Sequence, residues 1–440
     1  MNQNIEVLRA ACDAWLAASA FREGRDRHKR FTYGDQWSEP VDDHAGHIVT
    51  ERDLLLAKGR RPLTNNLIRQ MVKAIVGRYR NMAADTGRYD SGHDSVAARN
   101  RLADLDARML EEFVISGCAV QRVVAESRPG GAGVWIDNVN PRSFFVSRYT
   151  DPRGLDIEMI GMLHAMSLPE IINRFARGSA SRAERLGRLF GGGAGDRAFG
   201  ADTSLGIATP AAVDFFRAPA GKYRVIEVWT LDSRAVRGRG GRLHMQFVWR
   251  CRWLAPDGTV VDEFDSPYRH GSHPFVLRLY PLTDGEIHSF VEDVIDQQRA
   301  VNRLVVLIDT MMASSAKGTL LYPVRRLPKG MGLDDVARMW AAPDSVIPID
   351  NTGDMPTQVI SNTADSGAYQ ALNLQMRLMG EISGISDALL GRNVPAATGA
   401  GLYDAQVRNA SVALTDILET FVSFTVDRDE KVRETMADNC

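Results

Sequence analysis

The sequence of 440 residues contains little lysine, little cysteine and no excess of positive charge. Its net charge is -2, whereas a protein that grips duplex nucleic acid by its phosphates carries a clear basic excess. Tight, general DNA binding is therefore disfavoured, although transient or channel-like contact is not. Arginine supplies 46 of the 53 basic residues. This bias suits carboxylate pairing and subunit contacts, and a biased genome composition explains it equally well.

The four cysteines, Cys12, Cys118, Cys251 and Cys440, lie far apart and form no CxxC pair. Their spacing argues for a reducing compartment and against a zinc ribbon. No segment approaches the roughly 20 apolar residues that a membrane span needs, and the N-terminal stretch lacks the basic leader of an export signal. We therefore expect a soluble protein that makes no contact with a membrane.

Motifs for nucleotide binding are missing, because neither GxxxxGK[ST] nor GxGxxG occurs in the chain. Ser314 and Lys317 match the SxxK spacing of penicillin-recognising hydrolases, but the SDN and KTG partners of that motif are absent. Asp429 and Lys431 imitate part of a nuclease metal site. They stand two apart on an expected helix, where positions i and i+2 face away from each other.

The stretch "DDHAGH" gathers four side chains that can ligate a metal, namely Asp42, Asp43, His44 and His47. Its flanks are polar and loop-like, and no HExxH helix is present, which favours a solvated turn. We expect no catalytic residues, no metal and no cofactor. A hydrolase or nuclease that uses Ser314 and Lys317, or Asp429 and Lys431, is kept as the alternative.

The composition is that of an ordinary globular protein, with 44% hydrophobic and 25% charged residues. Its length exceeds one compact core and predicts two or three units. Helical spacing of apolar residues predicts helices from the start to about Arg27, from about Leu67 to Tyr79 with Asn65 or Asn66 as the cap, and over 95–116. Short β-branched and aromatic runs predict strands over 119–149 and 223–279, which we expect to form one mixed α+β unit.

Two further segments connect these strand blocks. The stretch "SLPEIINRF" predicts a short helix, and the glycine-rich stretch over 187–206 predicts a surface excursion. After them, "TDGE" fits a capping box in which Thr283 and Glu286 start a long helix that runs to about Ala316. A small unit is expected over 318–360, with "GTLLYPV" as a strand, "LDDVARMW" as a helix and "DSVIPID" over 344–350 as the second strand. A helix over 366–383, a loop rich in Gly, Pro and Ala, and a last helix over 402–437 follow.

Acidic residues outnumber basic residues along the long helix. The acidic residues are Glu286, Glu292, Asp293, Asp296 and Asp309, and the basic residues are Arg299, Arg303 and Lys317. A solvated helical face is the simple interpretation. A functional interpretation is that helices from several subunits surround a passage, whose acidic walls keep a polyanion moving.

The order of these segments resembles the portal proteins of tailed bacteriophages, particularly the podovirus-like group. The resemblance lies in "YGDQW" followed by "GRRPLTNNLIRQMVKAIVGRYRNM", in "GEIHSFVEDVIDQQRAVNRLV" and in "ISGISDALLGRNVPAATGAG". It covers most of 31–437, and the order of the segments carries it more than any one motif. In this setting we expect Trp37 of "YGDQW" to be a buried anchor rather than part of a substrate site.

The resemblance implies a predominantly helical α+β subunit with the parts of a portal. These parts are a wing (1–282), a first stem helix (283–317), a clip (318–361), a second stem helix (362–385), a tunnel loop (386–400) and a C-terminal wing helix (401–440), with little or no crown.

It also implies a dodecameric ring at one capsid vertex of the virion, assembled in the host cytoplasm. Genomic double-stranded DNA would pass through this ring during packaging and ejection. The expected partners are the terminase large subunit, the head-to-tail adaptor, and the major capsid and scaffolding proteins. An oligomeric scaffold that does not carry DNA remains a third interpretation.

Two sets of site residues follow from the resemblance. We expect the DNA channel to be lined by Glu292, Asp293, Asp296, Arg299, Arg303, Arg392, Asn393 and Thr398. We expect the clip to dock its partners through Arg325, Arg326, Lys329, Asp334 and Asp335.

Overall fold

The computed structural model of the chain describes residues 3–43, 46–89, 95–128, 131–191, 212–237, 243–283, 285–315, 319–324, 327–341, 347, 356–359, 365–385, 412 and 414–437. The fold is mixed α+β, and helices hold about half of the described residues. The chain divides into two compact units. The first unit comprises Met1–Lys29, Val72–Glu292 and Ser411–Cys440, and the second comprises Arg30–Met71 and Asp293–Ala410. None of the described helices has a stretch long and apolar enough to cross a membrane.

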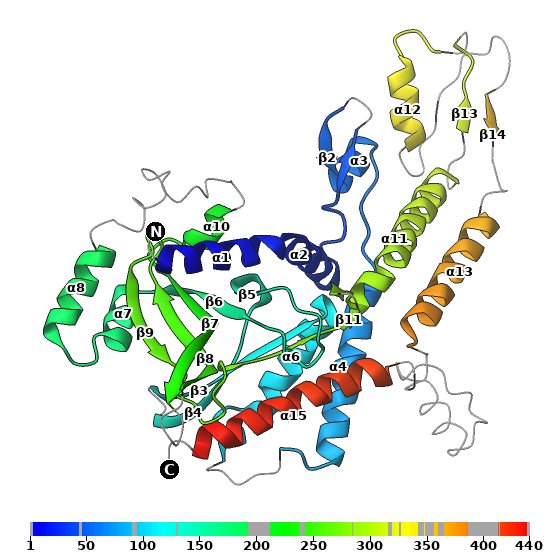
Figure 1. Cartoon of the computed structure of the whole chain (residues 1–440). Helices are drawn as coiled ribbons and strands as arrows, with labels where there is room; N and C mark the ends of the chain where they lie inside the picture. The colour runs from blue at the N-terminus through cyan, green and yellow to red at the C-terminus, as the bar shows by residue number, and fades with distance from the viewer. Residues whose placement is uncertain are drawn as a thin grey trace. The chain divides into compact units, whose positions relative to one another are not determined.

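Helices and strands alternate along the first unit (Figure 1). The helices are α1 (Gln3–Ala17), α2 (Ser19–Tyr33), α4 (Leu67–Asp85), α5 (Val96–Arg99), α6 (Leu102–Ser116), η1 (Pro141–Ser143), α7 (Leu168–Phe175), α8 (Ala180–Gly191), α10 (Val213–Phe216) and α15 (Thr415–Ala437). The strands are β3 (Cys118–Arg128), β4 (Gly131–Asn138), β5 (Phe144–Val146), β6 (Met159–Met166), β7 (Tyr223–Arg237), β8 (Leu243–Leu254), β9 (Val260–Asp265), β10 (Phe275–Leu279), β11 (Pro281–Thr283) and β12 (Glu286–Ile287). Helices α2 and α4 extend across the division into the second unit.

A five-stranded antiparallel sheet, in the order β5-β6-β7-β8-β9, has apolar side chains on both faces. Successive side chains of a strand point to opposite faces. Leu163 and Ile226 therefore lie on one face, where α1 and α10 cover them in a buried cluster with Trp15. Ile160 and Trp229 lie on the other face, in a cluster that includes Phe175 of α7 and Phe190 of α8. The two strand blocks expected from the sequence thus form one mixed unit, as predicted.

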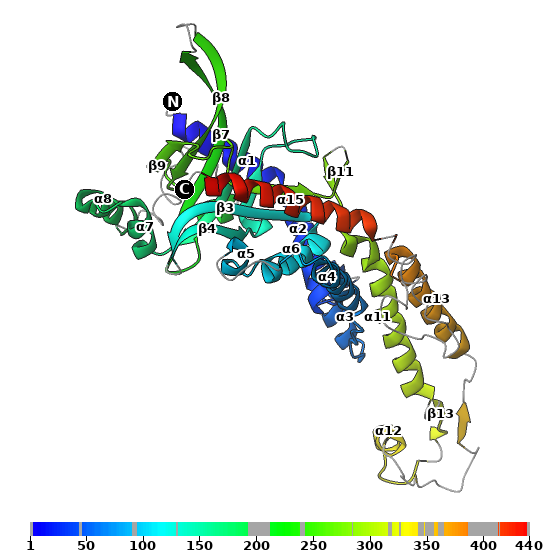
Figure 2. The same ribbon diagram turned by 90° about the horizontal axis from the view of Figure 1, so that it is seen from below.

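A second antiparallel sheet, in the order β10-β3-β4, supports the C-terminal helix. Helix α15 lies along this sheet (Figure 2). Its buried Phe421 stands 5.2 Å from the ring of Tyr79 and 5.8 Å from that of Phe113, measured between ring centroids. This aromatic group fixes α15 and α4 against α6.

The second unit is built around two helices, α11 (Phe290–Ser315) and α13 (Asp365–Ser383), which lie side by side (Figures 1 and 2). Its other elements are β1 (Pro40–Asp42), β2 (Ile48–Thr50), α3 (Glu51–Ala57), β13 (Thr319–Leu321), α12 (Leu333–Ala341) and β14 (Thr357–Val359). Strands β13 and β14 pair with each other. Together with α12 they lie beyond the C-terminal end of α11.

Several helices confirm the sequence predictions closely. Helix α13 matches the expected 366–383, and α7 starts with a capping box formed by Ser167 and Glu170. Asn66 caps α4, because its Oδ1 accepts a hydrogen bond of 3.0 Å from the amide of Arg69.

Other boundaries were wrong. The expected helix start at Thr283 is a hairpin, in which Thr283 of β11 pairs with Glu286 of β12. Helix α11 begins at Phe290, and the hydroxyl of Ser289 accepts from the amide of Glu292 at its first turn. The single N-terminal helix expected to Arg27 is divided at Ala18 into α1 and α2. The partner strand of β13 is β14, and Ile347, inside the strand expected over 344–350, is not in a strand.

Candidate functional site

Helix α11 separates an apolar face from an acidic face, as the spacing of its residues requires. Val291, Val294 and Val301 are buried, and Ile308, which is also buried, continues this face. Glu292, Asp293, Asp296 and Asp309 are exposed. With 26 residues the helix is roughly 40 Å long. Three of the residues predicted to line a channel, Glu292, Asp293 and Asp296, therefore lie exposed on the first two turns of a long rod.

Two amides on the buried face of α11 hold the start of α4. The Oε1 atom of Gln298 accepts from the amide of Leu67 at 2.9 Å, and its Nε2 atom donates to the carbonyl of Asn65 at 2.6 Å. Asn302 Oδ1 accepts from the amide of Asn65 at 3.1 Å. The first N–H groups of a helix have no partner within the helix. Gln298 and Asn302, both buried, supply such partners here.

The "YGDQW" stretch belongs to the same arrangement. Gln36 is 1% exposed and accepts at its Oε1 atom a hydrogen bond of 2.6 Å from Asn302 Nδ2. Trp37 is buried and donates from its indole to the hydroxyl of Thr64 at 3.0 Å. The prediction that Trp37 is a buried anchor is confirmed, whereas Tyr33 of the same stretch is exposed. This stretch therefore serves packing within the second unit.

The two arginines predicted for the channel, Arg299 and Arg303, share one carboxylate. The Nε atom of Arg303 lies 2.7 Å from Glu51 Oε1, and Arg299 Nη2 lies 3.5 Å from Glu51 Oε2. Glu51, the first residue of α3, is 7% exposed. Arg303 keeps 54% of its side chain exposed. No local pattern pointed to Glu51, which lies about 250 residues before its partners.

The remaining predicted site residues are only partly within the described part of the chain. Arg392, Asn393, Thr398, Arg325 and Arg326 lie outside it. Lys329 and Asp334 are exposed near α12. Asp335 accepts from the amide of Gly332 at 2.9 Å and forms an ion pair with Arg338, so it stabilises the first turn of α12.

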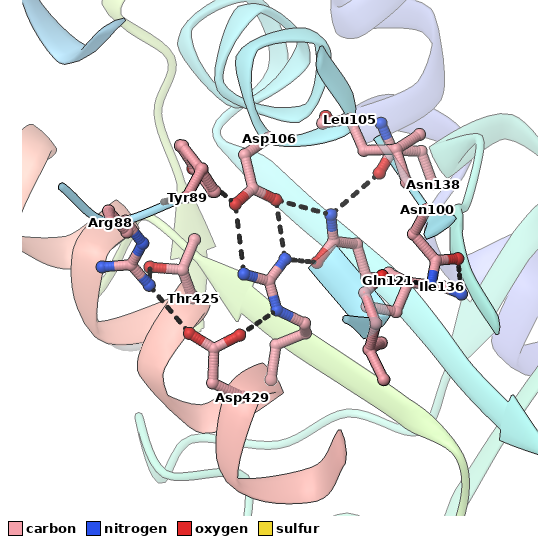
Figure 3. Close-up of polar contacts among 12 residues, drawn as sticks. Arg88, Tyr89, Asn100, Leu105, Asp106, Gln121, Ile136, Asn138, Thr425 and Asp429 are labelled. Atoms are coloured by element: carbon pink, nitrogen blue, oxygen red, sulfur yellow. Dashed lines mark hydrogen bonds and ion pairs between the residues drawn. The ribbon is translucent and has the colours of Figure 1, made fainter. Parts of the chain in front are cut away.

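The alternative nuclease residues are occupied by structural partners (Figure 3). Asp429 Oδ1 accepts from Arg428 Nε at 2.7 Å, and Asp429 Oδ2 accepts from Arg88 Nη2 at 3.0 Å. The Lys431 ammonium donates to the carbonyls of His273 and Phe275 at 2.7 and 2.9 Å. Burial lowers the pKa of Lys431 to about 8. These contacts leave Asp429 and Lys431 no common site for a metal or a substrate.

The other candidate catalytic patterns lie only partly within the described residues. Asp43 lies 3.2 Å from His47 in an exposed pair, and His44 is outside the described ranges. Ser314 is in the last turn of α11, while Lys317 is not described. Within the described part, no three His, Cys, Asp or Glu side chains are grouped as metal ligands would be.

Sequence reasoning missed a fully buried ion pair between Arg428 of α15 and Asp106 of α6 (Figure 3). Arg428 Nη1 and Nη2 lie 2.7 and 3.1 Å from the two Asp106 oxygens. Gln121 and Tyr89 also donate to this carboxylate, at 3.2 and 2.8 Å. Burial alone would lower the pKa of Arg428, but the Asp106 carboxylate outweighs it and raises that pKa. The burial of Arg428 could have been inferred from its position, because it lies on the same helical face as Phe421 and Phe424.

Comparison with known proteins gives one family. The family model described as Phage P22-like portal protein matches residues 8–423, nearly the whole chain. No curated protein matches this chain.

Proposed function

Because this chain belongs to the Phage P22-like portal protein family, we propose that its copies close into a dodecameric ring at one vertex of the capsid. Membership of this family makes it a structural, non-enzymatic protein of the virion, a head-tail connector with a role in DNA packaging. The family implies an oligomeric ring and the passage of DNA. The match over 8–423 is the observation that carries the proposal.

In the proposed ring, α11 and α13 are the two stem helices and line a channel for double-stranded DNA. The exposed carboxylates of Glu292, Asp293 and Asp296 support this role. An acidic wall repels the phosphate backbone and so disfavours a bound, immobile DNA. The pair that Arg299 and Arg303 form with Glu51 reduces the positive charge they offer to DNA. Arg392, Asn393 and Thr398 of the proposed tunnel loop over 386–400 would complete the channel.

The segment over 318–361 is the proposed clip, where the terminase large subunit and later the head-to-tail adaptor dock. Its described elements are β13, α12 and β14, which form a small unit between the two proposed stem helices. Lys329 and Asp334 are exposed and available to a partner. Arg325, Arg326 and Asp335 are the other proposed docking residues. Residues 1–282, with the C-terminal helix over 401–440, are the proposed wing, which faces the major capsid and scaffolding proteins.

Electron microscopy of the purified protein tests the ring directly, since class averages should show rings with a central pore. The channel is tested with the triple variant Glu292→Gln, Asp293→Asn and Asp296→Asn, built into procapsids and packaged by the cognate terminase. We expect slower packaging, because the wall loses its repulsion of phosphates. The matched control is Glu158→Gln, Glu184→Gln and Glu430→Gln, which removes three exposed carboxylates of the first unit.

The outcomes separate the interpretations. Rings whose packaging rate is unchanged in the stem variant favour a scaffold along which DNA does not pass. Monomers in every buffer overturn the ring itself. A hydrolytic activity that is lost on Ser314→Ala or Asp429→Ala would favour the alternative enzyme.

A further inference from the structure

The sheet face that α1 covers continues beyond the end of that helix. Leu163 and Ile226 pair across β6 and β7 and are buried under α1. Ala165 and Arg224, two cross-strand pairs further along, lie on the same face because side chains alternate along a strand. Helix α1 ends at Ala17. Arg224 thus lies beyond the end of α1, in the same recess as Trp15 of that helix.

Two recesses lie at this place, one of about 620 Å³ and one of about 550 Å³. Both are lined by Arg217, Ala218, Pro219 and Arg224, so they flank one segment that leads from α10 into β7. Each has the size of a typical small-molecule site. Trp15 contributes to the wall of the larger recess, and Phe190 and Tyr223 to that of the smaller one.

The walls of these recesses carry an excess of positive charge. Among the described lining residues the cations are Arg142, Arg217, Lys222 and Arg224, and the acid is Asp214. Asp214 lies 3.7 Å from Arg142, which also pairs with Asp26 at 3.1 Å. One lining carboxylate against four lining cations leaves the recesses electropositive, although the chain as a whole has a net charge of -2.

Arg224 is held by backbone carbonyls rather than by a carboxylate. Its Nη2 atom donates to the backbone carbonyls of Asp214, at 2.9 Å, and of Arg217. Its Nε atom is buried and has no hydrogen-bond partner among the described residues. Burial lowers the pKa of Arg224 to about 10, and Asp214 offsets this only in part. Arg224 as a whole is half-buried, and an anion bound beside such a cation favours its charged form.

We propose that the two recesses form one anion-binding site that takes a phosphate group. Phosphate presents several acceptor oxygens and up to two negative charges, which suits a wall of three guanidinium groups and one ammonium better than a single carboxylate would. The group comes from one of two sources, a free phosphate compound of nucleotide size or the backbone of DNA. This site is distinct from the proposed channel, since none of its residues is on α11 or α13.

Calorimetric titration of the full-length protein with inorganic phosphate, ATP and a short DNA duplex tests the site. Arg217→Ser with Lys222→Ser removes two exposed cations while keeping the backbone carbonyl that Arg224 uses. We expect binding of the phosphate probe to weaken by roughly tenfold or more, the effect of one lost charged hydrogen bond. The matched control, Arg153→Ser with Arg188→Ser, removes two arginines that are each 75% exposed, and should change binding less than about twofold.

Each result has one meaning. Binding of phosphate and ATP that depends on Arg217 and Lys222 supports a free phosphate compound as the ligand. Binding of the duplex alone, with the same dependence, supports the DNA backbone. Absence of binding for all three probes overturns the site, as does an equal loss in the test and control variants. Ring formation is recorded on the same samples, so a failure of this site is distinguishable from a failure of the ring.

Discussion

Charged side chains that are fully buried mark the positions where single residues matter most in this protein. Arg428 and Asp106 are both 0% exposed, and their contacts join α15 to α6 (Figure 3). Glu227 is equally buried, and it accepts from Arg122, His164 and the indole of Trp229. Burial alone would raise the pKa of Glu227, but Arg122 and His164 outweigh it and lower the pKa to about 2. Such pairs cost desolvation when they form and cost more when one partner is removed.

Removal of Arg428 is therefore expected to be severe. Arg428→Met leaves the Asp106 carboxylate buried without its cation and should lower the free energy of unfolding by roughly 3–5 kcal/mol, measured by urea denaturation. Adding Asp106→Leu should recover most of this loss, because an apolar pair often replaces a buried ion pair without cost. Arg377→Met, which removes an exposed pair with Glu381, should cost at most about 1 kcal/mol. A loss of similar size in both single variants would contradict this account.

Lys431 should give the stability a distinctive pH dependence. Burial lowers its pKa from 10.5 to about 8 in the folded protein. Between these two values the unfolded chain holds a proton that the folded chain has released, so stability rises with pH through this window. Below pH ~8 both states are protonated and the cost of burial is fully present. Lys431→Met removes the titration. Between pH 7 and 10.5 the free energy of unfolding of the wild type, relative to that of the variant, should thus rise by up to roughly 3 kcal/mol. Parallel stability curves for the two proteins would refute the assignment.

At the scale of elements, the turn after α6 depends on a residue without a side chain. Gly117 ends α6 with φ at +72°, and an added Cβ would lie 2.8 Å from Ile287 and 2.9 Å from the His288 carbonyl. Gly117→Ala should therefore lower the free energy of unfolding by roughly 2–4 kcal/mol. Gly77→Ala, inside α4 with nothing within 4 Å, should instead raise it by about 0.5–1 kcal/mol. Thermal unfolding of the two variants should shift in opposite directions, and shifts of the same sign would disprove the proposed crowding.

Elements whose shape is set by local spacing were predictable from the sequence. Helix α13 follows Leu372, Met376 and Met379 at helical intervals, and α7 carries its own capping box. The start of α11 was missed because "TDGE" satisfies a local helix rule, while Thr283 and Glu286 are paired across a hairpin instead. Gly117 contacts this region through the amide of Tyr280, which donates to its carbonyl at 2.8 Å. Such pairing is determined by packing between distant segments, which local patterns do not encode.

For the candidate site, too, local patterns were predictable from the sequence, whereas contacts between distant segments were not. The helical repeat of the sequence alone places Glu292 and Asp296 on one face of a helix, and Val294 and Val301 on another. It does not reveal that Arg303 meets Glu51, because those residues approach each other only in the folded chain. Nor does it reveal the positive recesses around Arg224, whose lining comes from six separate segments of the first unit.

At the scale of the whole molecule, the two long helices of the second unit carry exposed apolar side chains. Leu374 is 53% exposed and Ile382 is 46% exposed on α13, and Leu307 is 40% exposed on α11. Large exposed apolar patches mark surfaces that other molecules cover. In a ring, each copy offers one face to the next copy and a different face to the previous one, so contacts close without a free end. The proposed ring accounts for this exposure.

Substitution on α13 should therefore weaken assembly without unfolding the chain. Leu374→Glu with Ile382→Glu places two charges in the contact between copies, where an unpaired charge is costly. The fraction of protein in rings, measured by light scattering after gel filtration and by electron microscopy, should fall at least tenfold, while the circular dichroism spectrum stays that of wild type. Asn373→Glu with Gln246→Glu adds the same charge at exposed polar positions, one on α13 away from Leu374 and Ile382 and one on β8, and should assemble more nearly as wild type does. Rings formed at the wild-type yield by the first variant would show that this apolar face is not the surface that joins the copies.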